Sequence, residues 1–366
     1  MCNPRRTKNS TRLQRQRVAR IVQYKRLGVS GLKVSPLCLG MMSYGSPTWQ
    51  PWVLPKSAAR EFVKLALDYG INFFDTSDFY SYGASEEALG EATHGLVRRE
   101  QLVISTKVGM PMSELPNEQG NSRKRIRDAI DCSLRRLKTD YVDLYLLHKP
   151  DPETPIEETI DALEDLVRAG KILYYGASNF RTFQLAQAQQ YARARGGRGL
   201  AATQLQYNLV YREEERENLP FCSANGLGVM VYSPLARGWL IGGDAAPNEL
   251  TERERTRVQQ DVKGQALYGG EGDADVRARL HETAARLGLP PGRLAMAWVL
   301  GRPEVSTVLV GALEPNHLTE AVAALDIKLA AEDLAHLEGA YRPGPLRTAG
   351  FKEVMAQQKQ IAAVKK

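Results

Sequence analysis

The sequence has few cysteines and no long apolar segment. Its 366 residues include four cysteines, and none forms a CxxC pair or a metal-ligand spacing. Neither a disulfide framework nor a metal site is therefore expected. No apolar run approaches the roughly 20 residues that a membrane-spanning helix needs, and the N-terminus lacks the apolar core of a secretory signal. We expect a soluble, cytoplasmic protein without a membrane partner.

Several nucleotide-recognition signals are also missing. No GxGxxG segment follows a predicted strand and opens a helix, and no P-loop occurs. The formal net charge is +7, but residues 1–26 hold nine basic residues and no acidic one. The rest of the chain carries 40 basic and 42 acidic residues. Because the body of the protein has no basic field of its own, a nucleic-acid partner is disfavoured.

The basic N-terminal segment, residues 1–23, has two interpretations. Charge runs are commonly solvated tails, which favours a disordered extension. The segment is also rich in arginine, contains serine and threonine, and carries a weak apolar stripe that includes Leu13 and Val18. That composition fits an organellar transit peptide. Both interpretations leave these residues outside the folded domain.

From residue 57 onward, short apolar strands alternate with amphipathic helices, which predicts βαβ units and a parallel sheet. Strands are expected at residues 34–40, 71–75, 102–107, 142–148, 172–178, 201–206, 228–233 and 306–312. Helices are expected at residues 58–70, 85–96, 122–137, 155–170, 183–194, 213–226, 276–288, 293–300 and 317–325. Eight parallel strands are the number that closes a (β/α)8 TIM barrel, an α/β fold.

The barrel is expected to occupy residues 24–345 as one domain. Residues 24–33 would form a small N-terminal cap before the first strand. Residues 241–272 form a long polar stretch with no element assigned to them. The C-terminal tail, residues 346–366, is expected to pack over the barrel mouth.

Four polar residues fall at the ends of successive predicted strands: Asp75, Tyr80, Lys107 and His148. In a parallel barrel these ends share the face that carries the active site. Lys107 would stabilise the phenolate of Tyr80, whose unperturbed pKa is about 10. Asp75 would keep the lysine charged, and His148 would orient a carbonyl or relay the proton. We call these four residues the tetrad.

Motifs around the tetrad resemble the aldo-keto reductase family over about residues 24–345. They are GINFFDTSDFYSYGASEEALGEA, LVISTKVG, VDLYLLHKPD, GASNF, QLQYNLVYR, YSPLARGWL and VLVGALEPNHL. The SPLARG motif and the GFK near the C-terminus are most similar to the bacterial subgroup related to the potassium channel beta subunits. The resemblance implies an NADPH-dependent enzyme that reduces aldehydes or ketones to alcohols, with Tyr80 as general acid and NADH as the alternative cofactor.

The resemblance also assigns residues to a cofactor that lies extended across the barrel mouth. Ser178, Asn179 and Gln204 would hold the carboxamide, with Tyr232 stacked on the nicotinamide. The others are Gly40 and Met41 near the ribose, Ser233, Leu235 and Gly238 along the pyrophosphate, and Gly311, His317 and Glu320 around the adenosine phosphate. The family tends to have an amide or guanidinium where this chain has His317, and an asparagine where it has Ala321. This departure concerns the 2'-phosphate, so it bears on the choice between NADP and NAD.

Five aromatic residues on predicted loops would shape the substrate pocket: Tyr44, Trp49, Trp52, Phe79 and Trp239. The substrate implied by the family is a small carbonyl compound, such as an aldehyde, a dicarbonyl or a sugar. The sequence does not identify which one, nor does it give the oligomeric state.

Two other functions fit the same residues. Lys107 could form a Schiff base in a barrel lyase, a known use of desolvated lysines. The chain could also be a regulatory subunit that binds the cofactor and senses redox state, as the channel-associated relatives do, because those relatives keep the tetrad too.

Overall fold

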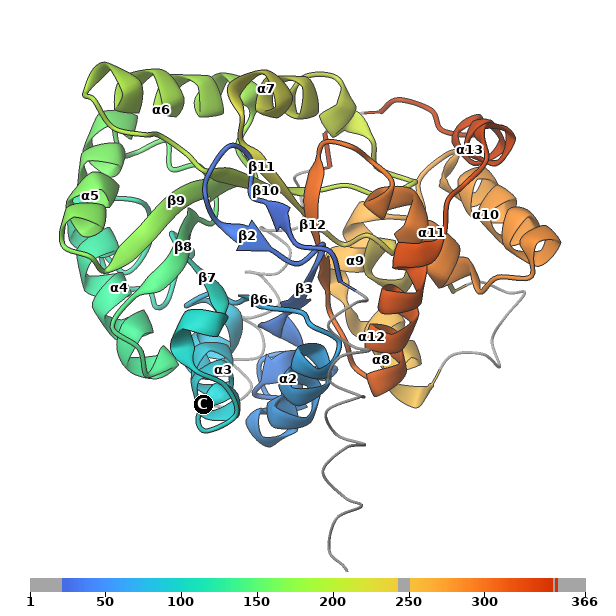
Figure 1. Ribbon diagram of the computed structural model, residues 1–366, viewed down its shortest axis with the longest axis horizontal. Helices are drawn as coiled ribbons and strands as arrows, with labels where there is room; N and C mark the ends of the chain where they lie inside the picture. The colour runs from blue at the N-terminus through green and yellow to red at the C-terminus, as the bar shows by residue number, and fades with distance from the viewer. Residues whose placement is uncertain (1–21, 243–250, 345, 348–366) are drawn as a thin grey trace, which may run out of the picture.

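A computed structural model describes residues 22–242, 251–344 and 346–347. Eight parallel strands form a closed barrel in the order β10-β11-β12-β3-β6-β7-β8-β9, which confirms the predicted TIM barrel (Figure 1). Their bounds are β3 Leu37–Gly40, β6 Phe73–Asp75, β7 Val103–Val108, β8 Val142–Leu147, β9 Ile172–Ser178, β10 Ala202–Gln206, β11 Gly228–Tyr232 and β12 Val305–Val310.

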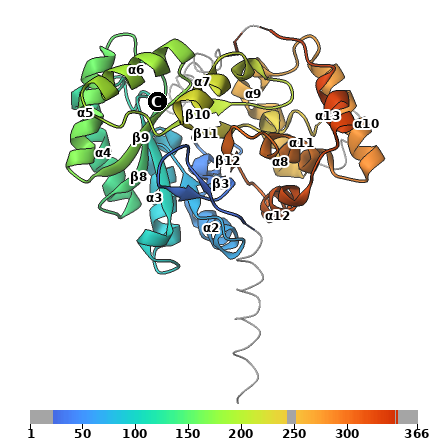
Figure 2. The same cartoon turned by 45° about the horizontal axis from the view of Figure 1, so that its top comes forward.

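Helices surround this barrel. Those that follow the first strands are α2 Ala59–Asp68, α3 Ala84–Thr93, α4 Arg123–Leu137, α5 Ile156–Arg168, α6 Thr182–Ala194 and α7 Asn218–Asn225. The later ones are α8 Glu252–Gln260, α9 Val262–Leu267, α10 Asp273–Leu287, α11 Pro291–Leu300, α12 Pro315–Ala323 and α13 Ala331–Glu338. Figure 2 shows α10 to α13 gathered on the side of the barrel opposite α4 and α5. None of the helices in the described residues is long and apolar enough to cross a membrane.

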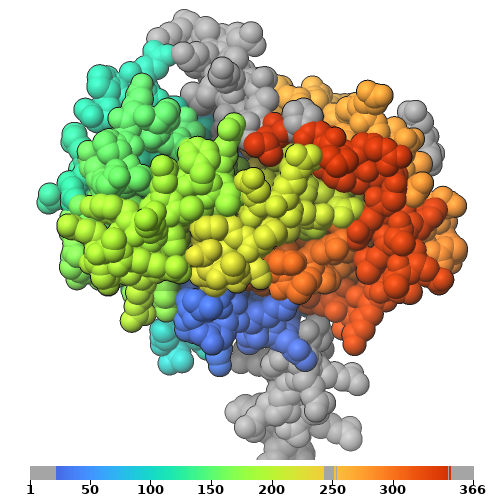
Figure 3. All heavy atoms as spheres, turned by 90° about the horizontal axis from the view of Figure 1, so that it is seen from above, coloured from blue at the N-terminus to red at the C-terminus, as the bar shows by residue number. Residues whose placement is uncertain are grey.

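A short hairpin closes the N-terminal end of the barrel. It pairs β1 Lys25–Arg26 with β2 Lys33–Val34. Leu27 from its turn is fully buried with barrel-interior side chains such as Phe73 and Met230, and the N–H of Val29 donates to the carbonyl of Gly226. In Figure 3 the blue hairpin lies directly beside the yellow segment that leads into β11. The cap expected at residues 24–33 is therefore present, and the opposite end of the barrel is left for the site.

Three expectations differ from the structure. The first barrel strand begins at Leu37, because Val34 pairs in the hairpin instead. The helix expected at residues 213–226 begins only at Asn218, after a separate 3-10 turn at Glu213–Glu215. The polar stretch 241–272 contains two helices, α8 and α9, that the sequence analysis did not assign.

The predicted terminal segments lie largely outside the described residues. Residues 1–21 of the N-terminal extension and residues 348–366 of the tail are among those not described. Arg347, near the end of the described chain, pairs with Asp273 at the start of α10, at 2.7 Å.

We predict that Gly28→Ala destabilises the barrel through its N-terminal closure. Gly28 has φ +59°, and an added Cβ would lie 2.3 Å from the carbonyl oxygen of Gly226. The left-handed conformation alone costs an L-residue about 1 to 2 kcal/mol, so the clash should bring the loss in free energy of unfolding to about 3 kcal/mol or more. Urea denaturation measures it. The matched control is Gly288→Ala, because Gly288 has φ +64° and no atom within 4 Å of its Cβ position. Equal losses in the two variants would contradict this account.

Candidate active site

The C-terminal ends of the barrel strands open into a cavity of about 440 Å³. Its lining includes the last residues of β3, β6, β9, β11 and β12, namely Gly40, Asp75, Ser178, Tyr232 and Val310. The cavity extends from the tetrad to α12, where His317 and Glu320 also line it. It therefore has the position that active sites take in this fold.

Lys107 and Asp75 form a buried ion pair beside this cavity. The Lys107 Nζ lies 2.5 Å from the Asp75 Oδ1, and the two side chains are 0% and 1% exposed. The same ammonium donates to the carbonyl of Thr76 at 2.8 Å and to the hydroxyl of Tyr80 at 3.3 Å. The other oxygen of Asp75 accepts hydrogen bonds from Ser105 at 2.6 Å and from Gln204 at 2.9 Å. Three members of the tetrad are thus linked directly.

These contacts, together with burial, determine the protonation states of Lys107 and Tyr80. Burial alone would lower the pKa of Lys107, but the Asp75 carboxylate outweighs it and the pKa is raised. Burial raises the pKa of Tyr80, and the charge of Lys107 opposes this without cancelling it. The expected lowering of the tyrosine pKa is therefore one contribution and not the net result. Tyr80 carries its proton at neutral pH, next to a permanent cation.

His148 completes the group from the end of β8. Its ring meets the ring of Tyr80 edge to face, with the centroids 5.6 Å apart. Burial, together with the charge of Lys107, lowers the pKa of His148 well below its usual value. The imidazole is therefore neutral, and it lies on the cavity wall beside the phenol.

The loop between β6 and α3 sets the position of Tyr80. Ser81 and Tyr82 both adopt left-handed backbone conformations with φ 51°, so the chain turns sharply after Tyr80. The buried Asp78 pairs with Arg125 of α4, which ties this loop to the neighbouring helix. Burial raises the pKa of Asp78 to about 7, despite the opposing charge of Arg125.

Most residues assigned to cofactor and substrate do line the cavity. They are Gly40, Ser178, Asn179, Gln204, Tyr232, Ser233, Leu235, Gly238, Gly311, His317 and Glu320, together with Trp49, Trp52 and Phe79. The hydroxyl of Tyr232 donates to Asn179 at 2.7 Å, and the amide of Asn179 donates to the carbonyl of His148 at 2.8 Å. These bonds connect the predicted nicotinamide residues to the tetrad.

Three assigned residues are absent from the cavity lining that the described residues form. Met41 is fully buried, and its neighbour Met42 lines the cavity instead, because the 3-10 turn Met41–Ser43 rotates the chain there. Tyr44 is fully buried against Phe62, and its hydroxyl donates to the carbonyl of Ala312. Trp239 packs under the guanidinium of Arg277, 4.4 Å from its ring.

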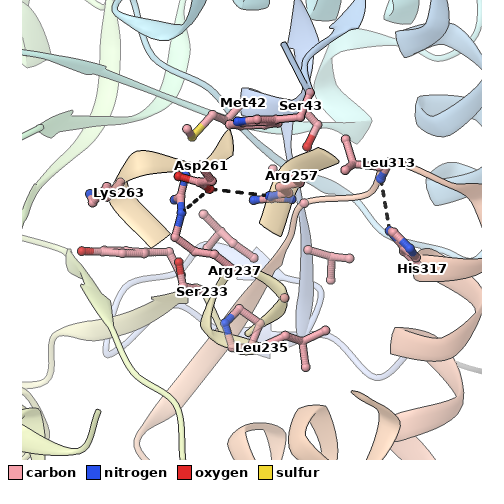
Figure 4. Close-up of a pocket in the computed structure, with 18 of the residues that line it drawn as sticks. Met42, Ser43, Ser233, Leu235, Arg237, Arg257, Asp261, Lys263, Leu313 and His317 are labelled. Atoms are coloured by element: carbon pink, nitrogen blue, oxygen red, sulfur yellow. Dashed lines mark hydrogen bonds and ion pairs between the residues drawn. The ribbon is translucent and has the colours of Figure 1, made fainter. Parts of the chain in front are cut away.

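A cationic cluster at the cavity was not foreseen from the sequence. It consists of Arg237 after β11, Arg257 on α8 and Lys263 on α9 (Figure 4). The carboxylate of Asp261 accepts a hydrogen bond from Arg237 at 2.6 Å and lies 3.9 Å from the Nε of Arg257. One carboxylate therefore forms ion pairs with two guanidinium groups. Burial and the charge of Arg237 lower the pKa of Arg257 to about 10 and that of Lys263 to about 7.

The sequence held one signal for this cluster. Thr251 and Glu254 form a capping box that starts α8, and the T-x-x-E spacing is a helix-start signature. The helix could therefore have been predicted. Its docking over the cavity could not, because its polar sequence gives no apolar face to orient it.

The end of the cavity near α12 contains two polar pairs. The Nδ1 of His317 accepts the N–H of Leu313 at 3.2 Å, and its Nε2 lies 2.7 Å from Glu254. Burial alone would raise the pKa of Glu254, but hydrogen bonds from His317 and Thr251 lower it to about 2. Glu320 forms a bidentate pair with Arg293, with both bonds at 2.8 Å.

The cavity fits an elongated anionic ligand with many hydrogen-bond acceptors. The Nε of Arg257 and the indole N–H groups of Trp49 and Trp52 are buried without a hydrogen-bond partner in the described structure. Buried donors are normally satisfied, so such orphaned groups suggest a missing acceptor. A dinucleotide phosphate chain would supply acceptors and negative charge. The described residues contain no cluster of His, Cys, Asp and Glu that could hold a metal ion.

The fold and the site together define a TIM barrel with a buried lysine and a half-buried tyrosine at the cavity on its C-terminal face. A family model described as the aldo/keto reductase family matches residues 36–342. The chain therefore belongs to the aldo/keto reductase family.

Similar proteins come from fungi and from a bacterium. A Schizosaccharomyces pombe protein, provisionally named an aryl-alcohol dehydrogenase, is 38% identical over 348 residues, covering 88% of this chain and 97% of the relative. The versiconal hemiacetal acetate reductase of Aspergillus parasiticus is 36% identical over 340 residues, with 88% and 98% covered. An uncharacterized oxidoreductase of Bacillus subtilis is 35% identical over 334 residues, with 88% and 97% covered.

Proposed function

We propose that this enzyme reduces aldehydes or ketones to alcohols with NADPH, using Tyr80 as the general acid. The observation that carries the proposal is the buried arrangement in which Lys107 contacts both Asp75 and the hydroxyl of Tyr80. A protonated phenol beside a fixed cation can give up its proton as negative charge develops on a carbonyl oxygen. The names of the similar proteins, which describe reductases and dehydrogenases, agree with this reaction class.

The reaction divides into roles for individual residues. A bound reduced nicotinamide would supply a hydride to the carbonyl carbon. Tyr80 donates its hydroxyl proton to the carbonyl oxygen, and Lys107 stabilises the resulting phenolate across 3.3 Å. Asp75 holds the ammonium in place, and the neutral His148 orients the carbonyl oxygen. The burial of this group strengthens each interaction, because the local dielectric is low.

The cofactor would lie along the cavity from Tyr232 to α12. Asn179 and Gln204 suit a carboxamide, because their side chains are fixed by Tyr232 and Asp75. The cationic cluster suits the phosphates. Arg257 lies near Gly311, within 3.6 Å of a Cβ placed there. This position at the end of β12 supports a contact with the 2'-phosphate, and hence NADPH over NADH.

Two alternatives receive less support. In a Schiff-base lyase Lys107 must lose its proton to attack a carbonyl, but Asp75 raises its pKa. A redox-sensing subunit would need the cofactor site without turnover. The close contact between Lys107 and Tyr80 has an evident use in proton transfer and none in binding alone, which favours the enzyme.

The cell compartment, substrate class and subgroup of the protein belong to the same proposal. We infer a cytoplasmic enzyme, because Cys38, Cys132 and Cys222 are free thiols, as expected in a reducing compartment. Its substrate would be a small carbonyl compound. The predicted relation to the bacterial subgroup similar to the channel beta subunits stays a prediction, since the relatives compared include many fungal reductases.

We predict that Tyr80→Phe lowers kcat for aldehyde reduction by a factor of about 10² to 10⁴, the range for a lost general acid. The dissociation constant for NADPH should change little, because the hydroxyl meets the carbonyl and not the cofactor. Loss of NADPH absorbance with a reactive aldehyde measures turnover, and fluorescence titration measures binding. Full activity in the variant would contradict the role of Tyr80. Failure of the unmodified protein to bind either nucleotide would contradict the reductase itself.

We predict that Arg257→Met weakens NADPH binding at least tenfold and NADH binding at most threefold, since a charged hydrogen bond contributes about 1.5 to 3 kcal/mol. Methionine keeps an apolar stem over Trp52, whose ring lies 4.6 Å from the guanidinium. The control is Arg255→Met, which removes the same charge from an exposed position on α8. Fluorescence titration with both nucleotides gives the comparison. Equal losses of affinity for NADPH and NADH would indicate that Arg257 contacts the diphosphate that both share. That result would remove this support for NADPH.

A further inference from the structure

The Nδ1 of His148 is hydrogen-bonded to a buried serine. The hydroxyl oxygen of Ser77 lies 3.0 Å from the Nδ1 of His148, and both residues are buried. The same oxygen accepts the backbone N–H of Phe79 at 3.2 Å and lies 3.3 Å from the Oδ1 of Asp78. Ser77 therefore sits between an imidazole and a carboxylate.

A single hydroxyl proton has to be shared between these two neighbours. If Nδ1 of His148 carried the ring proton, it would donate to Ser77, and the hydroxyl would then donate to Asp78. If Nδ1 carried no proton, the hydroxyl would donate to it. Hydroxyl to carboxylate bonds normally span about 2.5 to 3.0 Å, so 3.3 Å to Asp78 is long, whereas 3.0 Å to the ring nitrogen is an ordinary bonding distance. The distances favour donation from Ser77 to His148.

The carboxylate of Asp78 also receives a hydrogen bond from a different residue. Its Oδ2 accepts a short hydrogen bond from Arg125 of α4, so Asp78 has a donor other than the hydroxyl of Ser77. The ring of His148 is also fixed in place, because Phe79 and Tyr80 both contact it edge to face, with centroids 6.3 and 5.6 Å away. The imidazole is neutral and holds one ring proton, since burial and Lys107 lower its pKa.

We propose that Ser77 is a positioning residue that places the ring proton of His148 on Nε2. A histidine with this tautomer can donate a hydrogen bond to the carbonyl oxygen of the substrate. With the opposite tautomer, Nε2 would present a lone pair to that oxygen and repel it. The inference rests on the proposed function for its purpose, but the bond from Ser77 to His148 stands on geometry alone.

The tautomer is measured directly by ¹⁵N NMR on protein labelled at histidine, without cofactor or turnover. An unprotonated ring nitrogen resonates far downfield of a protonated one, and the His148 signals are identified by their loss in His148→Gln. We expect the downfield signal to be Nδ1 in the unmodified protein. In Ser77→Ala we expect this pattern to change and kcat to fall about tenfold, while the dissociation constant for NADPH stays within about twofold. Ser77→Thr keeps the hydroxyl and should retain the unmodified pattern.

Thr283→Val is the matched control, because Thr283 is a fully buried hydroxyl residue on α10 and is not among the cavity-lining residues. It should leave both the His148 signals and kcat unchanged. A ring proton on Nδ1 in the unmodified protein would overturn the proposal. So would a Ser77→Ala variant that lost activity with unchanged His148 signals, since that result would mark a purely structural residue. A protein that reduced no carbonyl compound would instead refute the proposed function, and the tautomer would still be readable.

Discussion

The site depends on one interaction, the buried ion pair between Lys107 and Asp75. Removing two charges from water is costly, and a buried pair persists only where further hydrogen bonds complete it. Here Ser105 and Gln204 satisfy one carboxylate oxygen, while Thr76 and Tyr80 accept from the ammonium. Ser105 and Gln204 lie within β7 and β10, and Thr76 and Tyr80 lie in the loop after β6. The closed barrel therefore stabilises the buried ion pair, because it brings residues of β6, β7 and β10 within hydrogen-bond distance of one another.

The surroundings of this pair have an excess of positive charge. Lys107 stands behind Tyr80, and Arg237, Arg257 and Lys263 lie along the cavity. This positive charge contributes to the state of two neighbouring groups, His148 and Arg257. Burial, aided by the charge of Lys107, lowers the pKa of His148 and keeps it neutral, so the imidazole acts as a hydrogen-bond partner and not as a second cation. Burial and the charge of Arg237 lower the pKa of Arg257 to about 10, and its Nε has no hydrogen-bond partner in the described structure, so an anionic ligand would stabilise this guanidinium.

The tetrad could be predicted from sequence because strand ends in a parallel barrel converge whatever the loops do. Ser178 and Tyr232 were predictable for the same reason, since each ends a barrel strand. Loop residues were less predictable. Met41 and Met42 differ by one position in a 3-10 turn, and Trp239 follows a sharp turn at Arg237 with φ 59°. The helix α8 was missed because charged residues dominate its sequence, and α9 was missed because it is only six residues long and contains Gly264. Only the fold shows that Arg257 and Lys263 face the cavity.

The most direct test of this account is transfer of deuterium from NADPH carrying deuterium at C4 of its nicotinamide to a reactive aldehyde, in the unmodified protein and in Lys107→Met. The account predicts an alcohol labelled at the former carbonyl carbon, and transfer at least about 100-fold slower in the variant, which still binds NADPH. Undiminished transfer in Lys107→Met would contradict the central role of the ion pair. Absence of label in the product, with borohydride trapping the aldehyde on Lys107, would contradict the reductase and favour a Schiff-base enzyme.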